Sequence, residues 1–209
     1  MADQLFGFIS TEEQISKAIE WLKSGKIEDE GRVILELKPK HKHSVLKKYF
    51  TLKDVADKDK FEMLELVMGD DKSDIAENVR LTCKAYLPNA AGKEETWKAL
   101  IDINSTESLK ERSAKMAGFH SWNQLDITRC YFDKFYDELR NIQAGTPHKY
   151  QEAFFYSLLP RYEISDAHIV KLVQLKNETP DNQATFANML QDGIELLIRS
   201  KQVRAHALS

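Results

Sequence analysis

The histidines are the first residues to consider, because an imidazole can bind a metal or transfer a proton near neutral pH. The chain has six of them: His41, His43, His120, His148, His168 and His206. A helical zinc site of the H-E-x-x-H kind needs two imidazoles one turn apart and a glutamate directly after the first. None of the six histidines is followed by glutamate. We therefore predict neither a catalytic residue nor a metal ligand in this chain.

The densest run of cations lies between Lys38 and Lys48 and holds five lysines and two histidines. The pair His41 and His43 could suggest a metal site. On a helix, however, residues two apart point about 200° away from each other, so they cannot hold the same ion. A nucleic-acid contact is a second alternative, but no aromatic residues alternate with the cations and the acidic run 28–30 lies close by. We predict a solvated basic face and no nucleic-acid partner.

The two cysteines, Cys83 and Cys130, each stand in an apolar helical context. We predict both to be small buried hydrophobic residues that stay reduced. A disulfide or a reactive thiol is the alternative. No glycine-rich phosphate loop occurs, and no serine stands in the strand-to-helix elbow of a hydrolase nucleophile. The sequence therefore predicts neither phosphate binding nor a serine nucleophile.

Length and composition describe an ordinary folded chain. Its 209 residues can form one large domain or two small ones and bury a real core. With 42% apolar and 30% charged residues and a net charge of −3, it is neither disordered nor broadly basic. No apolar run reaches the roughly 18 residues of a membrane span, and residues 1–14 lack the regions of a signal peptide. We predict a cytoplasmic chain with no membrane partner, and a leader or linker over part of residues 1–9.

Helix start and stop signals follow one another along almost the whole chain. The first is the capping box Ser10-x-x-Glu13, whose helix ends at Gly25. Further starts stand at Pro39, Asp57, Ser73, Lys93, Thr106, Ser121, Pro147, Ser165 and Pro180. The helix that opens at Ser121 is predicted to run to about Ile142. Together these signals predict about ten helices of roughly 10 to 25 residues, joined by short loops.

The predicted fold is therefore all-α. Short connections make consecutive helices antiparallel neighbours, which gives either an armadillo- or HEAT-like superhelix or a compact bundle. Only Arg32–Leu37 has a strand-like pattern. Because a lone strand has nothing to pair with, we predict this stretch to be helical or irregular.

The segment from Lys93 to Tyr136 carries a resemblance to a known family. Its motifs are K-x-x-x-W at Trp97, G-F-x-x-x-x-Q from Gly118-Phe119 to Gln124, and Y-x-x-x-[YF]-[FY] from Tyr131. This spacing resembles the C-terminal, endoplasmic-reticulum-aminopeptidase-like domain of the aminopeptidase N and puromycin-sensitive aminopeptidase family of zinc metallopeptidases. The resemblance continues through Glu152-Ala153 and the 158–160 Leu-Leu-Pro stop. His120 is a departure, since that family position is often tryptophan.

The resemblance implies a single all-helical domain over residues 1–209, built from antiparallel helix pairs. In the family this domain closes the active-site chamber and helps to orient peptide substrates. The zinc would belong to the parent enzyme, because this chain lacks both H-E-x-x-H and the amine-binding motif G-x-M-E-N. Its implied partners are the catalytic and N-terminal domains of the same enzyme and the peptide substrate. The alternative is a freestanding helical-repeat scaffold that binds a partner protein.

Three residues are candidates for contact with the chamber or the peptide: Phe119, Gln124 and Arg161. The loop from Gly118 to Gln124 could project toward a shared cavity, with Gly118 allowing the backbone to turn and Gln124 partly exposed. Core packing is the alternative for the aromatic residues near this loop. The basic residues that the family places near the substrate could be any of Arg112, Arg129, Arg161, Arg199 and Arg204. For Arg161, a salt-bridged surface arginine is the alternative.

Overall fold

The computed structural model describes Ile9 and residues 11–207, which are mostly α-helical, as predicted. In chain order the elements are α2 (Glu12–Ser24), β1 (Lys26–Asp29), β2 (Arg32–Glu36), α3 (Pro39–Tyr49), α4 (Asp57–Met68), α5 (Asp74–Tyr86), α6 (Ala90–Ile101), α7 (Leu109–Ala117), η1 (Trp122–Gln124), α8 (Leu125–Thr128), α9 (Cys130–Gly145), α10 (His148–Leu158), α11 (Asp166–Asn177), η2 (Asp181–Gln183) and α12 (Ala184–Ala207).

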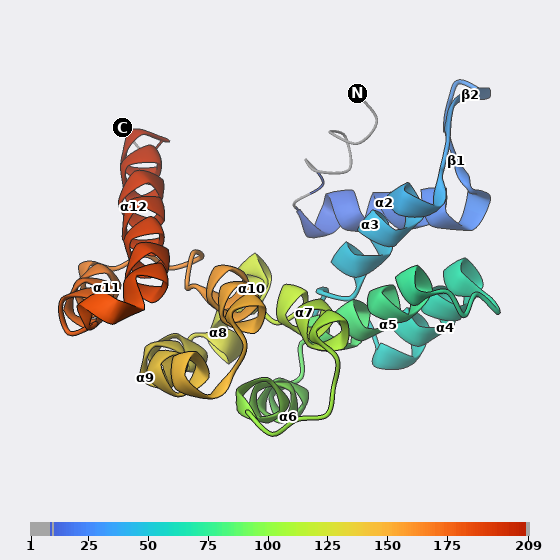
Figure 1. The fold of residues 1–209 in the computed structure, drawn as a ribbon. Coiled ribbons are helices and arrows are strands. Elements are labelled where there is room, and N and C mark those ends of the chain that lie inside the picture. Colours follow the sequence, from blue (N-terminus) through green and yellow to red (C-terminus); the bar gives the residue numbers. More distant parts are fainter. Residues whose placement is uncertain (1–8, 10, 208–209) are drawn as a thin grey trace.

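The helices follow an open arc with two rows (Figure 1). Helices α3, α5, α7, α10 and α12 pack in succession along the inner row, and α4, α6, α9 and α11 lie outside them. Helix α12 at one end and the hairpin β1–β2 at the other both project toward the concave side. The all-α prediction is confirmed, and the armadillo- or HEAT-like superhelix stays a prediction.

The first helix begins one residue later than predicted. Thr11 is its N-cap and forms the capping box with Gln14, while Ser10 lies outside the described residues. The predicted long helix from Ser121 is also interrupted. It consists of η1, α8 and α9, and the Ser121 hydroxyl makes no capping bond but donates to Asn123 Oδ1 at 2.7 Å.

The interpretation of Arg32–Leu37 as helical or irregular is wrong. Strand β2 pairs with β1 in an antiparallel hairpin, with Lys26 opposite Glu36 and a bulge near Ile27. The two-residue turn is Glu30-Gly31, and both residues have positive φ, as a type I′ turn requires. Strand β1 was not predicted because its four residues, KIED, show no strong alternation of apolar and polar side chains.

The core consists of two hydrophobic clusters. One gathers the buried apolar residues between positions 9 and 83, and the other those between 97 and 197. Polar bonds cross the junction between them: Thr82 Oγ1 donates to the Ala114 carbonyl at 3.1 Å, and Lys93 bonds to Ala85 O. Helices α5 and α7 pack directly on one another at this junction.

Three buried basic side chains link their own helices, by hydrogen bonds, to the ends of earlier helices. Each is the fourth residue of its helix: Lys60 in α4, Lys93 in α6 and Arg112 in α7. Their side-chain nitrogens donate to a carbonyl near the end of a preceding helix, at 2.5 Å for Lys60, 2.6 Å for Lys93 and 2.6 Å for Arg112. Carbonyls in a last helical turn lack a partner in their own helix and lie at the negative end of its dipole. A side-chain N–H donor is therefore stabilising there.

The two cysteines differ in exposure, so the prediction that both are buried is wrong for one of them. Cys83 is fully buried, and burial raises the pKa of its thiol to about 12. Cys130, at the start of α9, is exposed. We expect a thiol reagent such as Ellman's to titrate one cysteine in the native protein and both in urea. Rapid reaction of both thiols without denaturant would contradict this packing.

Candidate functional site

The residues that carry the family resemblance meet in the core. Lys93 Nζ donates to three backbone carbonyls: Ala85 at 2.6 Å, Gly118 at 3.2 Å and Phe119 at 2.5 Å. The Trp97 ring packs against the Phe119 ring with centroids 5.7 Å apart. The lysine and tryptophan of K-x-x-x-W thus hold the Gly-Phe pair in place. This motif builds the fold, so core packing is the correct interpretation of its aromatic residues.

Gly118 is required by close packing and not by a turn. Its φ is −95°, an ordinary right-handed value. A Cβ at this position would lie 2.2 Å from the Thr82 carbonyl oxygen and 2.9 Å from Ala85 Cβ, both on α5. The expected role of Gly118 in turning the backbone is therefore wrong, and its role is to let α7 approach α5.

Gln124 is fully buried, so the prediction that it is partly exposed is wrong. Its Nε2 donates to the Tyr86 carbonyl at 2.7 Å and to the Thr51 carbonyl at 3.1 Å. Tyr86 is the last residue of α5 and Thr51 lies just beyond α3, so the amide ties both helices to the 121–124 turn. Gln124 is thus a structural residue in this conformation.

Replacing Gln124 by leucine is expected to cost about 2 to 3 kcal/mol, because the Tyr86 and Thr51 carbonyls lose a buried donor. Urea denaturation followed by circular dichroism measures this change. The matched control is Asn123→Leu, whose half-buried amide also donates to the Thr51 carbonyl; we expect it to cost less than half as much. Equal and small effects at both positions would contradict the structural role of Gln124.

Of the other two candidates, Phe119 is fully buried and Arg161 is exposed. Arg161 forms no ion pair with a carboxylate of the described residues, so the salt-bridge alternative does not hold there. Its Nη2 donates to the Tyr156 carbonyl instead. Among the further arginines, Arg112 is buried in the core and Arg129 pairs with Glu163 at 2.5 Å.

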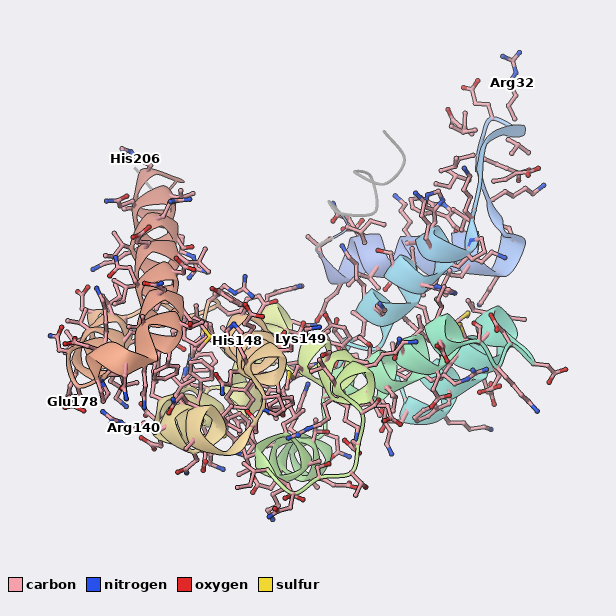
Figure 2. The ribbon with its side chains drawn as sticks, viewed as in Figure 1. Arg32, Arg140, His148, Lys149, Glu178 and His206 are labelled. Carbon is pink, nitrogen blue, oxygen red and sulfur yellow. The ribbon has the colours of Figure 1, made fainter. Side chains whose placement is uncertain are left out.

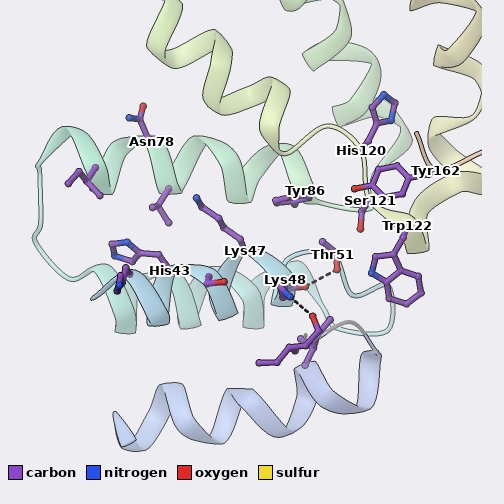
Figure 3. Close-up of a pocket in the computed structure, with 16 residues that line it drawn as sticks. His43, Lys47, Lys48, Thr51, Asn78, Tyr86, His120, Ser121, Trp122 and Tyr162 are labelled. Carbon is purple, nitrogen blue, oxygen red and sulfur yellow. Dashed lines mark hydrogen bonds between the residues drawn. The ribbon is translucent and has the colours of Figure 1, made fainter. Parts of the chain in front are cut away.

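Arg161 lines the smaller of two neighbouring cavities. The larger, of about 660 Å³, lies between α2, α3, α5 and the loop 120–122 (Figure 3). The smaller, of about 510 Å³, lies between the end of α7, the end of α10 and α12. His120 and Tyr162 belong to the walls of both cavities. The two hollows thus adjoin at these residues and form the candidate site, which we call the basic groove.

Among the residues that the structure describes, the lining of the basic groove is rich in basic side chains. These are Lys40, His43, Lys47, Lys48, His120, Arg161 and Arg204. No aspartate or glutamate of residues 11–207 belongs to either wall. Tyr86 and Tyr162 add hydroxyl groups, and Trp122, 46% exposed, adds an aromatic surface. Such a surface can hold an anionic or peptidic ligand.

His120 is buried between the two cavities as a neutral ring. The pKa of His120 is lowered to about 3, chiefly by desolvation and also by the charges of Lys93 and Arg161, while a backbone hydrogen bond with Leu158 acts in the opposite direction. That bond uses Nε2, because Nδ1 has no partner. Phe119 and Phe132 face the ring edge-on, at 4.9 Å and 5.5 Å between centroids.

Replacing His120 by phenylalanine is expected to make the protein less sensitive to acid. The folded-state pKa of His120, about 3, lies below the unfolded value of 6.5, so between these values the unfolded state binds more protons. Stability is therefore lost as pH falls from 6.5, at up to about 1.4 kcal/mol per pH unit from this one group. Urea denaturation at pH 6.5 and pH 4.5 should show a smaller loss in the variant. An equal loss in both proteins would contradict a neutral buried His120.

Other kinds of site find no support in the described residues. Within residues 11–207, no three His, Cys, Asp or Glu side chains gather in a way that could hold an ion, and the absence of metal binding by His41 and His43 stays a prediction. His41 is buried, so the predicted solvated basic face holds for only part of the 38–48 segment. None of the helices described combines the length and apolar character that a membrane span needs.

Comparison with known proteins gives one informative similarity. No protein-family model matches the chain. A stretch of 139 residues is 22% identical to aminopeptidase N of Streptomyces lividans. The stretch covers 66% of this chain and 16% of the Streptomyces protein. This weak similarity agrees with the motifs between Lys93 and Tyr136 and supports an aminopeptidase-like relationship.

The sequence reasoning missed most of the basic groove. Lys47 was placed on a solvated face, yet it is half-buried in the groove wall, and Tyr86 and Tyr162 received no role. A usable signal was the lack of acidic residues in the inner helix α3 itself, where Lys38–Tyr49 contains none. The pairing of α3 with residues 120–122 and 162 depends on tertiary structure, which no local pattern predicts.

Proposed function

We propose that this chain is a peptide-binding helical domain of an aminopeptidase-like zinc metallopeptidase, and that it is not itself catalytic. The domain would close the active-site chamber and orient the peptide, while a separate catalytic domain holds the zinc. The single observation that carries the proposal is the basic groove on the inner side of the arc, which has peptide-binding groups and no catalytic constellation. The similarity to an aminopeptidase N and the motif core around Lys93 support it.

The physical basis of this function is exclusion and orientation. A rigid wall of packed helices can limit which peptides approach a metal and can hold them in one direction, which lowers the entropic cost of reaction. Rigidity follows from the fastening of successive helices by buried cations and by Gln124. We propose a cytoplasmic location, no nucleic-acid or membrane partner, and contact with the catalytic and N-terminal domains of the same enzyme.

The proposal is tested with the chain as it stands. Peptides of about ten residues should bind it saturably, as measured by isothermal titration calorimetry, and no free amino acid should be released from them. Single amino acids should bind at least about tenfold more weakly, because they fill a small part of a groove of this volume. Failure of every peptide to bind would remove the proposal and favour the alternative of a scaffold for a folded partner protein.

A further inference from the structure

Two arginines of the basic groove differ in their partners from several exposed cations elsewhere in the described residues. Elsewhere on the surface, exposed cations pair with carboxylates: Lys171 with Asp133 and Lys201 with Asp166, each at 2.5 Å. Arg140 pairs with Glu178 in the same way (Figure 2). Within the groove, by contrast, two guanidinium groups bind backbone carbonyls.

Arg204 donates to the Tyr162 carbonyl at 3.0 Å and to the Arg161 carbonyl at 2.6 Å, and Arg161 donates to Tyr156. Neither arginine forms an ion pair with a carboxylate of the described residues. Since a guanidinium carries five N–H donors, both side chains are held in place with donors to spare and with their charge uncompensated.

Lys47 supplies charge at the other end of the groove. It lies half-buried between α3 and α5 and forms no ion pair with a described carboxylate. Burial is the main cause of the lowered pKa of His43, and the charge of Lys47 lowers that pKa further. The negative charge of Asp71 raises the pKa of His43 and so opposes these two effects. For Cys83, burial raises the pKa and the charge of Lys47 opposes the rise. The net field in this part of the groove is therefore positive, in a chain whose overall charge is −3.

The shape of the basic groove suits an extended peptide better than a single ion. Its two parts adjoin at His120 and Tyr162, and cations lie in both of them. Tyr162, 42% exposed, and Trp122 provide aromatic surface, while Ile75 and Val79 provide an apolar wall. A ligand that spans both parts must therefore carry several negative charges on an extended, partly apolar backbone.

We propose that the basic groove selects acidic peptides, whose aspartate or glutamate side chains contact Lys47 in one part and Arg161 and Arg204 in the other. This inference rests on the proposed function, since it names the class of peptide that the same groove prefers. The recognised chemistry is a carboxylate, which could also come from a peptide C-terminus. Lys47 in one part and Arg161 and Arg204 in the other form no ion pair with a described carboxylate, and this separation favours several carboxylates along the peptide over a single terminal one.

The test compares decapeptides that differ in charge alone, with the full chain in the calorimeter. An acetylated and amidated peptide of alternating alanine and glutamate is compared with its glutamine counterpart, and with the glutamine peptide carrying a free C-terminal carboxylate. We expect the glutamate peptide to bind at least about tenfold more tightly than either, and its affinity to fall with added salt.

Variants assign the effect to the groove. Lys47→Gln is expected to weaken binding of the glutamate peptide about tenfold, and Arg161→Gln similarly, since a charged hydrogen bond of this kind is worth about 1.5 kcal/mol or more. Lys58→Gln is the matched control, because it removes the same charge from an exposed site on α4 outside both cavities. It should leave the affinity unchanged.

Four results would overturn the inference. Equal affinity for the glutamate and amidated glutamine peptides would remove the acidic preference and leave the proposed function standing. Tightest binding of the free-acid glutamine peptide would assign the cations to a C-terminal carboxylate. Loss of affinity in Lys58→Gln as large as in Lys47→Gln would assign it to overall charge. Binding of no peptide at all would remove the proposed function as well.

Discussion

Replacing Gly118 by alanine is expected to destabilise the protein by about 3 kcal/mol or more, the largest effect of a glycine-to-alanine change among the glycines that the structure describes. The new Cβ would lie 2.2 Å from the Thr82 carbonyl oxygen and 2.9 Å from Ala85 Cβ. Neither neighbour is the flexible end of a side chain, so relief requires moving α7 away from α5. Urea denaturation followed by far-ultraviolet circular dichroism measures the loss.

A matched control lies at Gly92, near the start of α6. A Cβ there would meet no atom closer than 3.8 Å, on Asn89. Gly92→Ala should therefore be neutral or stabilise the protein by up to about 1 kcal/mol, since alanine is the better helix former. If Gly118→Ala were as well tolerated as Gly92→Ala, the close approach of α7 to α5 would be wrong.

Replacing Lys93 by methionine is expected to cost about 3 kcal/mol. The change removes the buried donor of the Ala85, Gly118 and Phe119 carbonyls, and each unsatisfied buried acceptor costs about 1 to 3 kcal/mol. Relief from burying an ammonium group offsets part of that loss. Lys98→Met on the same helix is the control: Lys98 is exposed and pairs only with Glu94, so we expect a change within about 0.5 kcal/mol.

Lys93 should also give the protein a dependence on alkaline pH. Burial lowers the pKa of Lys93 to about 7, below its ordinary value of 10.5. Between these values the unfolded state binds more protons, so the free energy of unfolding should rise with pH across this range. The difference between the wild type and Lys93→Met should therefore grow from pH 7 to pH 9. A difference that is constant or shrinks would contradict a folded-state pKa near 7.

Local sequence patterns predict one part of this structure, and the other part depends on tertiary contacts. The helices were predictable because caps such as Ser73 and stops such as Gly25 act within one turn of chain. The hairpin was not, because the pairing of a charged β1 with β2 depends on a turn at Glu30-Gly31 that has no apolar strand before it. The burial of Lys60 and Arg112 could have been predicted from one regularity, because each cation is the fourth residue of its helix.

In the candidate site, too, local motifs predict some residues and tertiary structure alone reveals the others. The motif residues Phe119 and Gln124 attracted attention because they match a family pattern, yet both are buried and stabilise the fold. Arg161 was one of several equivalent arginines in the sequence, and only the tertiary structure places it in a cavity with Arg204. Motif matching finds residues that the fold requires, whereas a binding surface is assembled from residues far apart in sequence.

The most direct test of a peptide-binding domain is hydrogen exchange of the whole chain with and without a saturating decapeptide. We predict added protection in α3, in α5 and in the segments 118–122 and 159–162, which form or flank the basic groove, with little change in α4, α6 and α9 of the outer row. Protection confined to the outer row or to the β1–β2 hairpin, or none at all under conditions where the peptide binds, would contradict a binding site on the inner side of the arc.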